Sequence, residues 1–148
     1  MTTYSLTILI AAQPDRVWRA LCDPGEVVLW DSSVVAALDA PAGYPRPGQH
    51  VRWRCKAGIG PFTLLHDRPK AVEPNRRLAS LLDLGPVHID ETYNLSPEAP
   101  GTRLDLALDV SYRPRVLSPV LRRLFPPASI YAGFDASITN LKRHCETN

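Results

Sequence analysis

Glu91 is the polar side chain whose position in the sequence most directly suggests chemistry. It alternates in step with the apolar residues Val87, Ile89 and Tyr93, so we expect it to point into the interior of a sheet. A buried carboxylate is costly, and its pKa rises unless a cation pairs with it. Such a group suits proton transfer or a hydrogen bond to a ligand hydroxyl. The alternatives are a strand end at a cavity mouth, or an ion pair with an arginine.

His66 is the second candidate for acid–base chemistry. It occupies alternate positions with Phe62 and Leu64, which favours an inward direction, and it would act with Glu91 if their two strands lie together. A proline at position 69 can shift the strand register, however, and a single histidine on a strand is more often structural or exposed. We therefore keep both interpretations of His66.

Apolar side chains spread along the chain are candidates for the wall of a binding pocket. Each has either the inward alternation of a predicted strand or a place on the apolar stripe of the last predicted helix. Core packing is an equally good interpretation, because cores and pocket walls use the same residue types. The set is Trp53, Phe62, Leu64, Ile89, Tyr93, Leu106, Leu108, Ile130, Phe134 and Ile138. Tyr93 could also donate a hydrogen bond.

The cysteines and histidines predict no metal and no cofactor. Cys22, Cys55 and Cys145 are far apart and odd in number, which argues against a disulfide framework. No group of histidine, cysteine and carboxylate residues has the spacing of metal ligands.

A basic segment follows the last predicted strand and contains Arg113, Arg115, Arg122 and Arg123. It is either a solvated face, a gate near a cavity mouth, or a patch for an anionic partner such as a lipid headgroup, RNA or an acidic protein surface. The net charge of the whole chain is only +2, so charge alone predicts no DNA binding.

Length and composition fit one globular domain over residues 1–148, with 45% hydrophobic and 22% charged residues. The apolar run at residues 6–12 is too short for a membrane span or a signal segment. A cytoplasmic location is the expectation that follows.

The periodicity of the chain changes twice, from helical to alternating and back. A first strand over 3–11 is followed by a helix opened by Pro14 and a second short helix over 26–30, and 114–125 contains another short helix before a long one over 128–145. Between them we expect strands at 33–38, 50–56, 62–72, 77–84, 87–95 and 103–112. The pattern predicts an α+β protein with an antiparallel sheet of about seven strands.

This order, together with particular residues, resembles the START-related superfamily, and most closely its polyketide cyclase/dehydrase and lipid-transport (SRPBCC) branch. The resemblance covers about residues 3 to 145 and depends on the order and spacing of individually weak motifs. These are Val17–Pro24 followed by Trp30-Asp31, then Val72–Leu78, Gly101–Leu104 and Asn140–Arg143. It implies a helix-grip fold, in which a curved antiparallel sheet wraps around the long C-terminal helix and leaves a hydrophobic cavity.

Three functions remain open at this point. The first is noncovalent binding or transport of a small hydrophobic ligand, lipid-like or aromatic. The second, implied by the resemblance, is a cyclase or aromatase that uses Glu91 or His66 as acid or base. The third is a protein- or RNA-interaction module with a nearly filled cavity. Whether the chain is an enzyme is undecided from the sequence.

Overall fold

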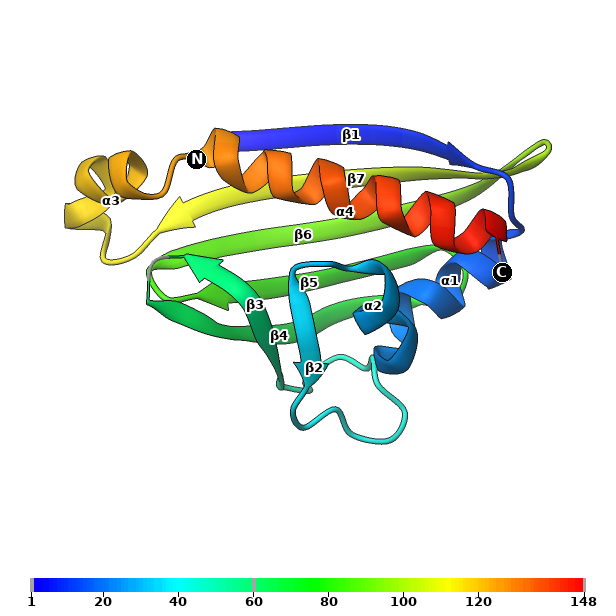
Figure 1. Cartoon of the computed structure of the whole chain (residues 1–148), viewed down its shortest axis with the longest axis horizontal. Helices are drawn as coiled ribbons and strands as arrows, with labels where there is room; N and C mark the ends of the chain where they lie inside the picture. Colours follow the sequence, from blue (N-terminus) through cyan, green and yellow to red (C-terminus); the bar gives the residue numbers. More distant parts are fainter. Residues whose placement is uncertain (1, 60, 148) are drawn as a thin grey trace.

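A computed structural model describes residues 2–59 and 61–147 of the chain (Figure 1). Its seven strands are β1 Thr2–Ile10, β2 Val34–Ala37, β3 Val51–Ile59, β4 Phe62–Glu73, β5 Arg77–Leu84, β6 Val87–Glu98 and β7 Gly101–Tyr112. The helices are α1 Pro14–Cys22, α2 Pro24–Trp30, the short 3-10 helix η1 Arg115–Leu117, α3 Ser118–Leu124 and α4 Pro127–Thr147. This α+β arrangement confirms the predicted helix-grip fold.

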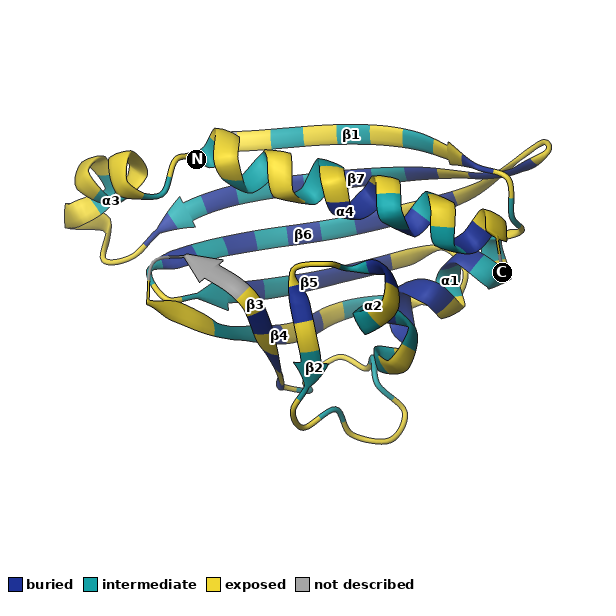
Figure 2. Ribbon diagram, viewed as in Figure 1, coloured by how far each residue is buried: buried dark blue, intermediate teal, exposed yellow. Residues whose placement is uncertain are grey.

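All seven strands form one curved antiparallel sheet in the order β1-β7-β6-β5-β4-β3-β2. Helix α4 runs along the sheet beside β1 and β7, while α1 and α2 lie near its C-terminal end (Figure 1). Buried residues alternate along β6 and β7 with residues that are mostly half-buried (Figure 2). An antiparallel sheet commonly keeps one face in the core and the other in water, and this alternation is its signature.

The core is closely packed where α4 lies over β1 and β7. Leu106 and Leu108 of β7 pack in one buried cluster with Ile138 and Leu141 of α4, and each of these side chains is at most 1% exposed. The hydroxyl of Tyr4 also donates a hydrogen bond to Asp135 of α4 at 2.8 Å. One edge of the sheet is therefore in close contact with the helix.

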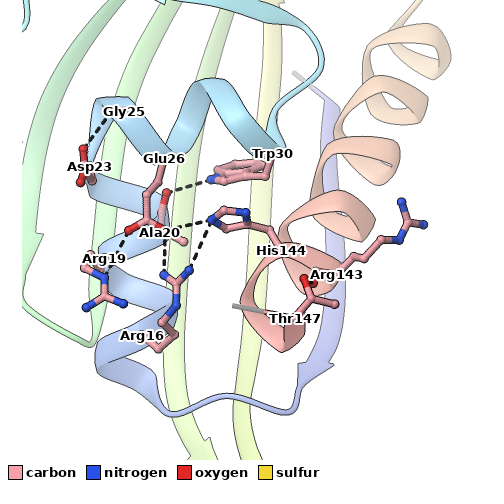
Figure 3. Close-up of polar contacts among 10 residues, drawn as sticks. All are labelled: Arg16, Arg19, Ala20, Asp23, Gly25, Glu26, Trp30, Arg143, His144 and Thr147. Atoms are coloured by element: carbon pink, nitrogen blue, oxygen red, sulfur yellow. Dashed lines mark hydrogen bonds and ion pairs between the residues drawn. The ribbon is translucent and has the colours of Figure 1, made fainter.

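A polar cluster fastens the end of α4 to α1 and α2 (Figure 3). Glu26 Oε1 lies 2.8 Å from Arg16 Nη1 and 2.9 Å from His144 Nε2. Burial opposes ionisation of Glu26, but these hydrogen bonds and the arginine charges outweigh it and lower its pKa. Trp30 Nε1 donates to the carbonyl oxygen of Ala20 at 2.8 Å, which joins the two short helices. The helices are thus held against one end of the sheet.

Candidate functional site

A cavity of about 590 Å³ lies between the sheet, α2 and α4, away from the edge where α4 and β1 touch. Its floor comes from β3 to β6, and its opposite wall from α2 and α4. A strongly curved sheet cannot meet one straight helix across its whole width, which leaves this space. Most of the lining is apolar, and a smaller number of polar groups come from both the sheet side and the helix side.

Six of the predicted site residues line the cavity. Five belong to the predicted apolar wall and the sixth is the candidate acid. They are Trp53, Ile89, Tyr93, Ile130, Phe134 and Glu91. The alternation in β3 and β6 and the apolar stripe of α4 therefore predicted the inward direction of these side chains.

The predicted inward direction of Phe62, Leu64 and His66 is wrong. Trp53 of β3 lies opposite Leu65 of β4, and side chains directly opposite each other in a sheet share a face. The inward residues of β4 are consequently Leu65 and Asp67, both of which line the cavity.

Phe62, Leu64 and His66 instead line a separate, smaller hollow. His66 Nδ1 lies 2.8 Å from Nε2 of His50, a partner that does not line the cavity. His66 therefore does not meet Glu91, and the proposed acid–base partnership of these two residues has no geometric support.

Leu106, Leu108 and Ile138 are core residues and do not line the cavity. Their predicted inward direction is correct, since all three side chains are buried in the core. They lie where the sheet and α4 are in contact, so no space remains beside them. The core interpretation, which the sequence left open, holds for these three.

Glu91 is buried as predicted, and within the described part of the chain no cation lies beside it. Burial raises its pKa to about 8, and the charge of the nearby Asp67 carboxyl adds to the rise. The Tyr93 hydroxyl, which donates to Glu91 Oε2 at 3.3 Å, opposes it. At neutral pH the Glu91 carboxyl is therefore mostly protonated and able to donate a hydrogen bond or a proton.

Asp67 is a site residue that the sequence analysis missed. Its Oδ2 accepts hydrogen bonds from the Tyr44 hydroxyl at 2.7 Å and from Trp53 Nε1 at 3.1 Å. Burial raises its pKa, while these two donors and the nearby Ser80 favour the ionised form. The exposed Arg68 and Lys70 were the signal that could have found it, because their positions leave Asp67 on the inner face.

The far wall of the cavity carries a third carboxyl group, Asp31, whose Oδ1 already accepts hydrogen bonds. Asp31, which follows α2, accepts hydrogen bonds at Oδ1 from the Ser33 hydroxyl at 2.6 Å and from the Ser137 hydroxyl at 3.1 Å. The contact with Ser137 links the end of α2 to α4 within this wall. Asp31 therefore helps to hold the end of α2 against α4.

The rim of the cavity comes from the segment that joins β7 to α4. Leu124 and Phe125 line the cavity, and Leu124 is 65% exposed, which places it at an opening. All four arginines of the basic segment, Arg113, Arg115, Arg122 and Arg123, are exposed around this rim, and Arg122 also stacks over the Tyr112 ring. The basic segment therefore lies beside the cavity opening, and its three possible roles (solvated face, gate, or patch for an anionic partner) stay predictions.

Metal-binding clusters and membrane-spanning helices are both absent from the described residues. No group of three histidine, cysteine, aspartate or glutamate side chains there is arranged to hold a metal ion. None of the helices described has the length and apolar character needed to cross a membrane.

The family model for polyketide cyclase/dehydrase and lipid-transport proteins matches residues 1–146. The chain belongs to this family. A search of curated proteins finds no match.

Solved structures share the fold of this family member at low identity. Protein CV1439 from Chromobacterium violaceum is 20% identical, with 97% of this chain and 96% of that one covered at a TM-score of 0.76. Protein MLL2253 from Mesorhizobium loti is 22% identical, with coverages of 99% and 98% and a TM-score of 0.74. DynU16, a protein in the dynemicin biosynthetic locus, is 22% identical over 98% of this chain and 47% of its own, with a TM-score of 0.69. These likenesses concern the fold alone.

Proposed function

We propose that this polyketide cyclase/dehydrase and lipid-transport family member binds and carries a small hydrophobic molecule in its cavity. The volume of about 590 Å³ is the observation that carries the proposal, because ligand pockets typically measure about 300–1,000 Å³. The mostly apolar wall would stabilise a complex by about 25 cal/mol per Å² of apolar area removed from water. The few inward polar groups would orient the ligand.

Native mass spectrometry of gently purified protein tests this proposal. We expect a co-purified apolar molecule, or a one-to-one complex with at least one member of a broad panel of fatty alcohols, sterols and polycyclic aromatics. Quenching of the cavity residues Trp30 and Trp53 should accompany binding, because both rings line the cavity. Absence of any complex across the panel would count decisively against a carrier.

A cyclase-type enzyme is the second candidate, supported by the two inward carboxyl groups. Glu91 and Asp67 face one apolar space, and opposite protonation states would suit an acid and a base. His66 has no place in this version, because it lies outside the cavity.

Glu91→Gln separates the carrier from the enzyme. A carrier should keep its affinity within about threefold, because the amide fills the same space and still forms hydrogen bonds. An enzyme that relies on proton transfer from Glu91 should lose about 100-fold or more in turnover. Affinity and turnover measured on the same ligand distinguish the two.

The interaction-module hypothesis expected a nearly filled interior, which does not fit a cavity of about 590 Å³. An RNA or protein partner for Arg113, Arg115, Arg122 and Arg123 stays a prediction. The exposed apolar residues Val116 and Val120 lie among these arginines, so the same segment would also suit a gate through which the ligand passes. A cytoplasmic location likewise stays a prediction.

A further inference from the structure

The acidic and basic residue types are unequally represented in the described lining of the cavity, because all of the residues of these types are acids. The described residues of its wall include three carboxylic acids, Asp31, Asp67 and Glu91, and include no lysine, arginine or histidine. A ligand carboxylate that entered would lose its hydration and meet no positive charge in return. The wall is thus unsuited to an anionic ligand such as a free fatty acid.

Asp67 carries a buried acceptor oxygen that no regular hydrogen bond occupies within the described residues, although the Ser80 side chain lies near the carboxylate. One carboxylate oxygen is held by Tyr44 and Trp53, but the other, Oδ1, is buried and has no partner of regular hydrogen-bond geometry among the described residues. The side chain is only 5% exposed and lines the cavity. A buried acceptor without a donor is unfavourable, so a donor on a bound molecule would be favourable there.

The apolar surfaces beside Asp67 fix the direction of such a ligand. Leu65 lies opposite Leu84, and this pair is two residues nearer to the β5–β6 turn than Asp67 is. The pair therefore lies on the side of the cavity toward Tyr112 and α3. Phe125 lines the same end. A donor group at Asp67 would therefore leave the apolar body of the ligand extending along these side chains toward the rim.

We propose that the cavity selects apolar molecules with a hydroxyl or ammonium donor that binds Asp67 Oδ1, and rejects carboxylates of the same size. This inference rests on the proposed carrier function and specifies its ligand class. Hydroxyl and ammonium groups share the required chemistry, an O–H or N–H donor without negative charge. The discrimination belongs to the deep end of the cavity and leaves the apolar body of the ligand unspecified.

Four probes with one aromatic body test the inference: pyrenemethanol, pyrenemethylamine, methylpyrene and pyreneacetate. Energy transfer from tryptophan to pyrene gives the dissociation constant of each. We expect the tighter of the alcohol and the amine to bind about tenfold or more tightly than the acetate, and at least about threefold more tightly than methylpyrene. A preference for the alcohol would identify a hydroxyl donor, and one for the amine an ammonium donor.

Asp67→Asn assigns the selectivity to its residue, because asparagine keeps the shape and removes the charge. The acetate should then bind within about threefold of the alcohol. Asp90→Asn is the matched control, since Asp90 pairs with Lys70 outside the cavity and its loss should leave the preference unchanged. The unaltered protein alone still decides the ligand class if the Asp67 variant does not fold.

The possible failures are distinguishable. Acetate binding as tight as alcohol binding, or methylpyrene binding as tight as both donors, would overturn the ligand class and leave the carrier intact. An unchanged preference in Asp67→Asn would overturn the assignment to Asp67. Failure of all four probes to bind would overturn the inference, and failure of the broad apolar panel as well would overturn the carrier proposal.

Discussion

Replacing Glu91 with glutamine is expected to stabilise the protein above about pH 8 by a few kcal/mol and to change little near pH 4.5, where an ordinary glutamate titrates. The unfolded chain releases the Glu91 proton near pH 4.5, whereas burial and the Asp67 charge keep it bound in the folded protein up to about pH 8. Between these values the unfolded state binds fewer protons, so stability falls as the pH rises. Glutamine has no proton to lose and removes this part of the decline.

Denaturant unfolding at a series of pH values measures the effect. Asp67 also has a raised pKa, so a smaller decline of the same sign should remain in the variant. Glu98→Gln is the matched control, because Glu98 lies on the same strand and is exposed. Parallel stability curves for the unaltered protein and Glu91→Gln would show that Glu91 ionises freely and is not buried as the structure places it.

Much of the fold could be predicted because the strands and helices follow from the periodicity of apolar residues that are close in the sequence. The alternation in β6 and β7 and the apolar stripe of α4 each arise from one element that buries one face. Glu91 could be found for the same reason, since its direction depends only on its neighbours within β6. Predictions of this kind need no knowledge of how elements meet.

The β3–β4 hairpin shows where prediction from the local sequence pattern fails, because the direction of the β4 side chains was predicted wrongly. Ile59 lies opposite Phe62 beside the turn, but Arg54 lies opposite Leu64, so the register shifts between them. An irregularity of this kind leaves residues unpaired, and an odd shift exchanges the inner and outer faces. The sequence around the turn did not reveal the shift, and Asp67 was missed as a consequence.

The local sequence pattern also could not predict which inward residues pack in the core and which line the cavity. Leu108 and Ile89 have the same alternation, yet Leu108 is packed against other core residues and Ile89 lines open space. The difference depends on how far the sheet has curved away from α4 at each strand. Tyr44 illustrates a related limit, because it reaches Asp67 from a loop whose sequence indicated only turns.

Gly133→Phe is expected to weaken binding of pyrenemethanol about tenfold or more while the fold is retained. Gly133 lines the cavity from α4, and a Cβ atom there would meet no heavy atom within 4 Å. Gly133 is exposed and thus lies where the cavity opens, so a phenylalanine ring has room to fill this opening without displacing packed atoms. Glycine is also unfavourable within a helix, by about 0.5–1 kcal/mol relative to alanine, so the substitution should not destabilise α4.

Gly133→Ala is the control that separates volume from helix propensity. It should raise the unfolding free energy by about 0.5–1 kcal/mol and leave affinity nearly unchanged, because a methyl group occupies little of about 590 Å³. If the folded phenylalanine variant bound pyrenemethanol as tightly as the unaltered protein, the ligand would have to sit elsewhere. The smaller hollow lined by Phe62 and Leu64 would then be the place to test, because Gly133 does not line it.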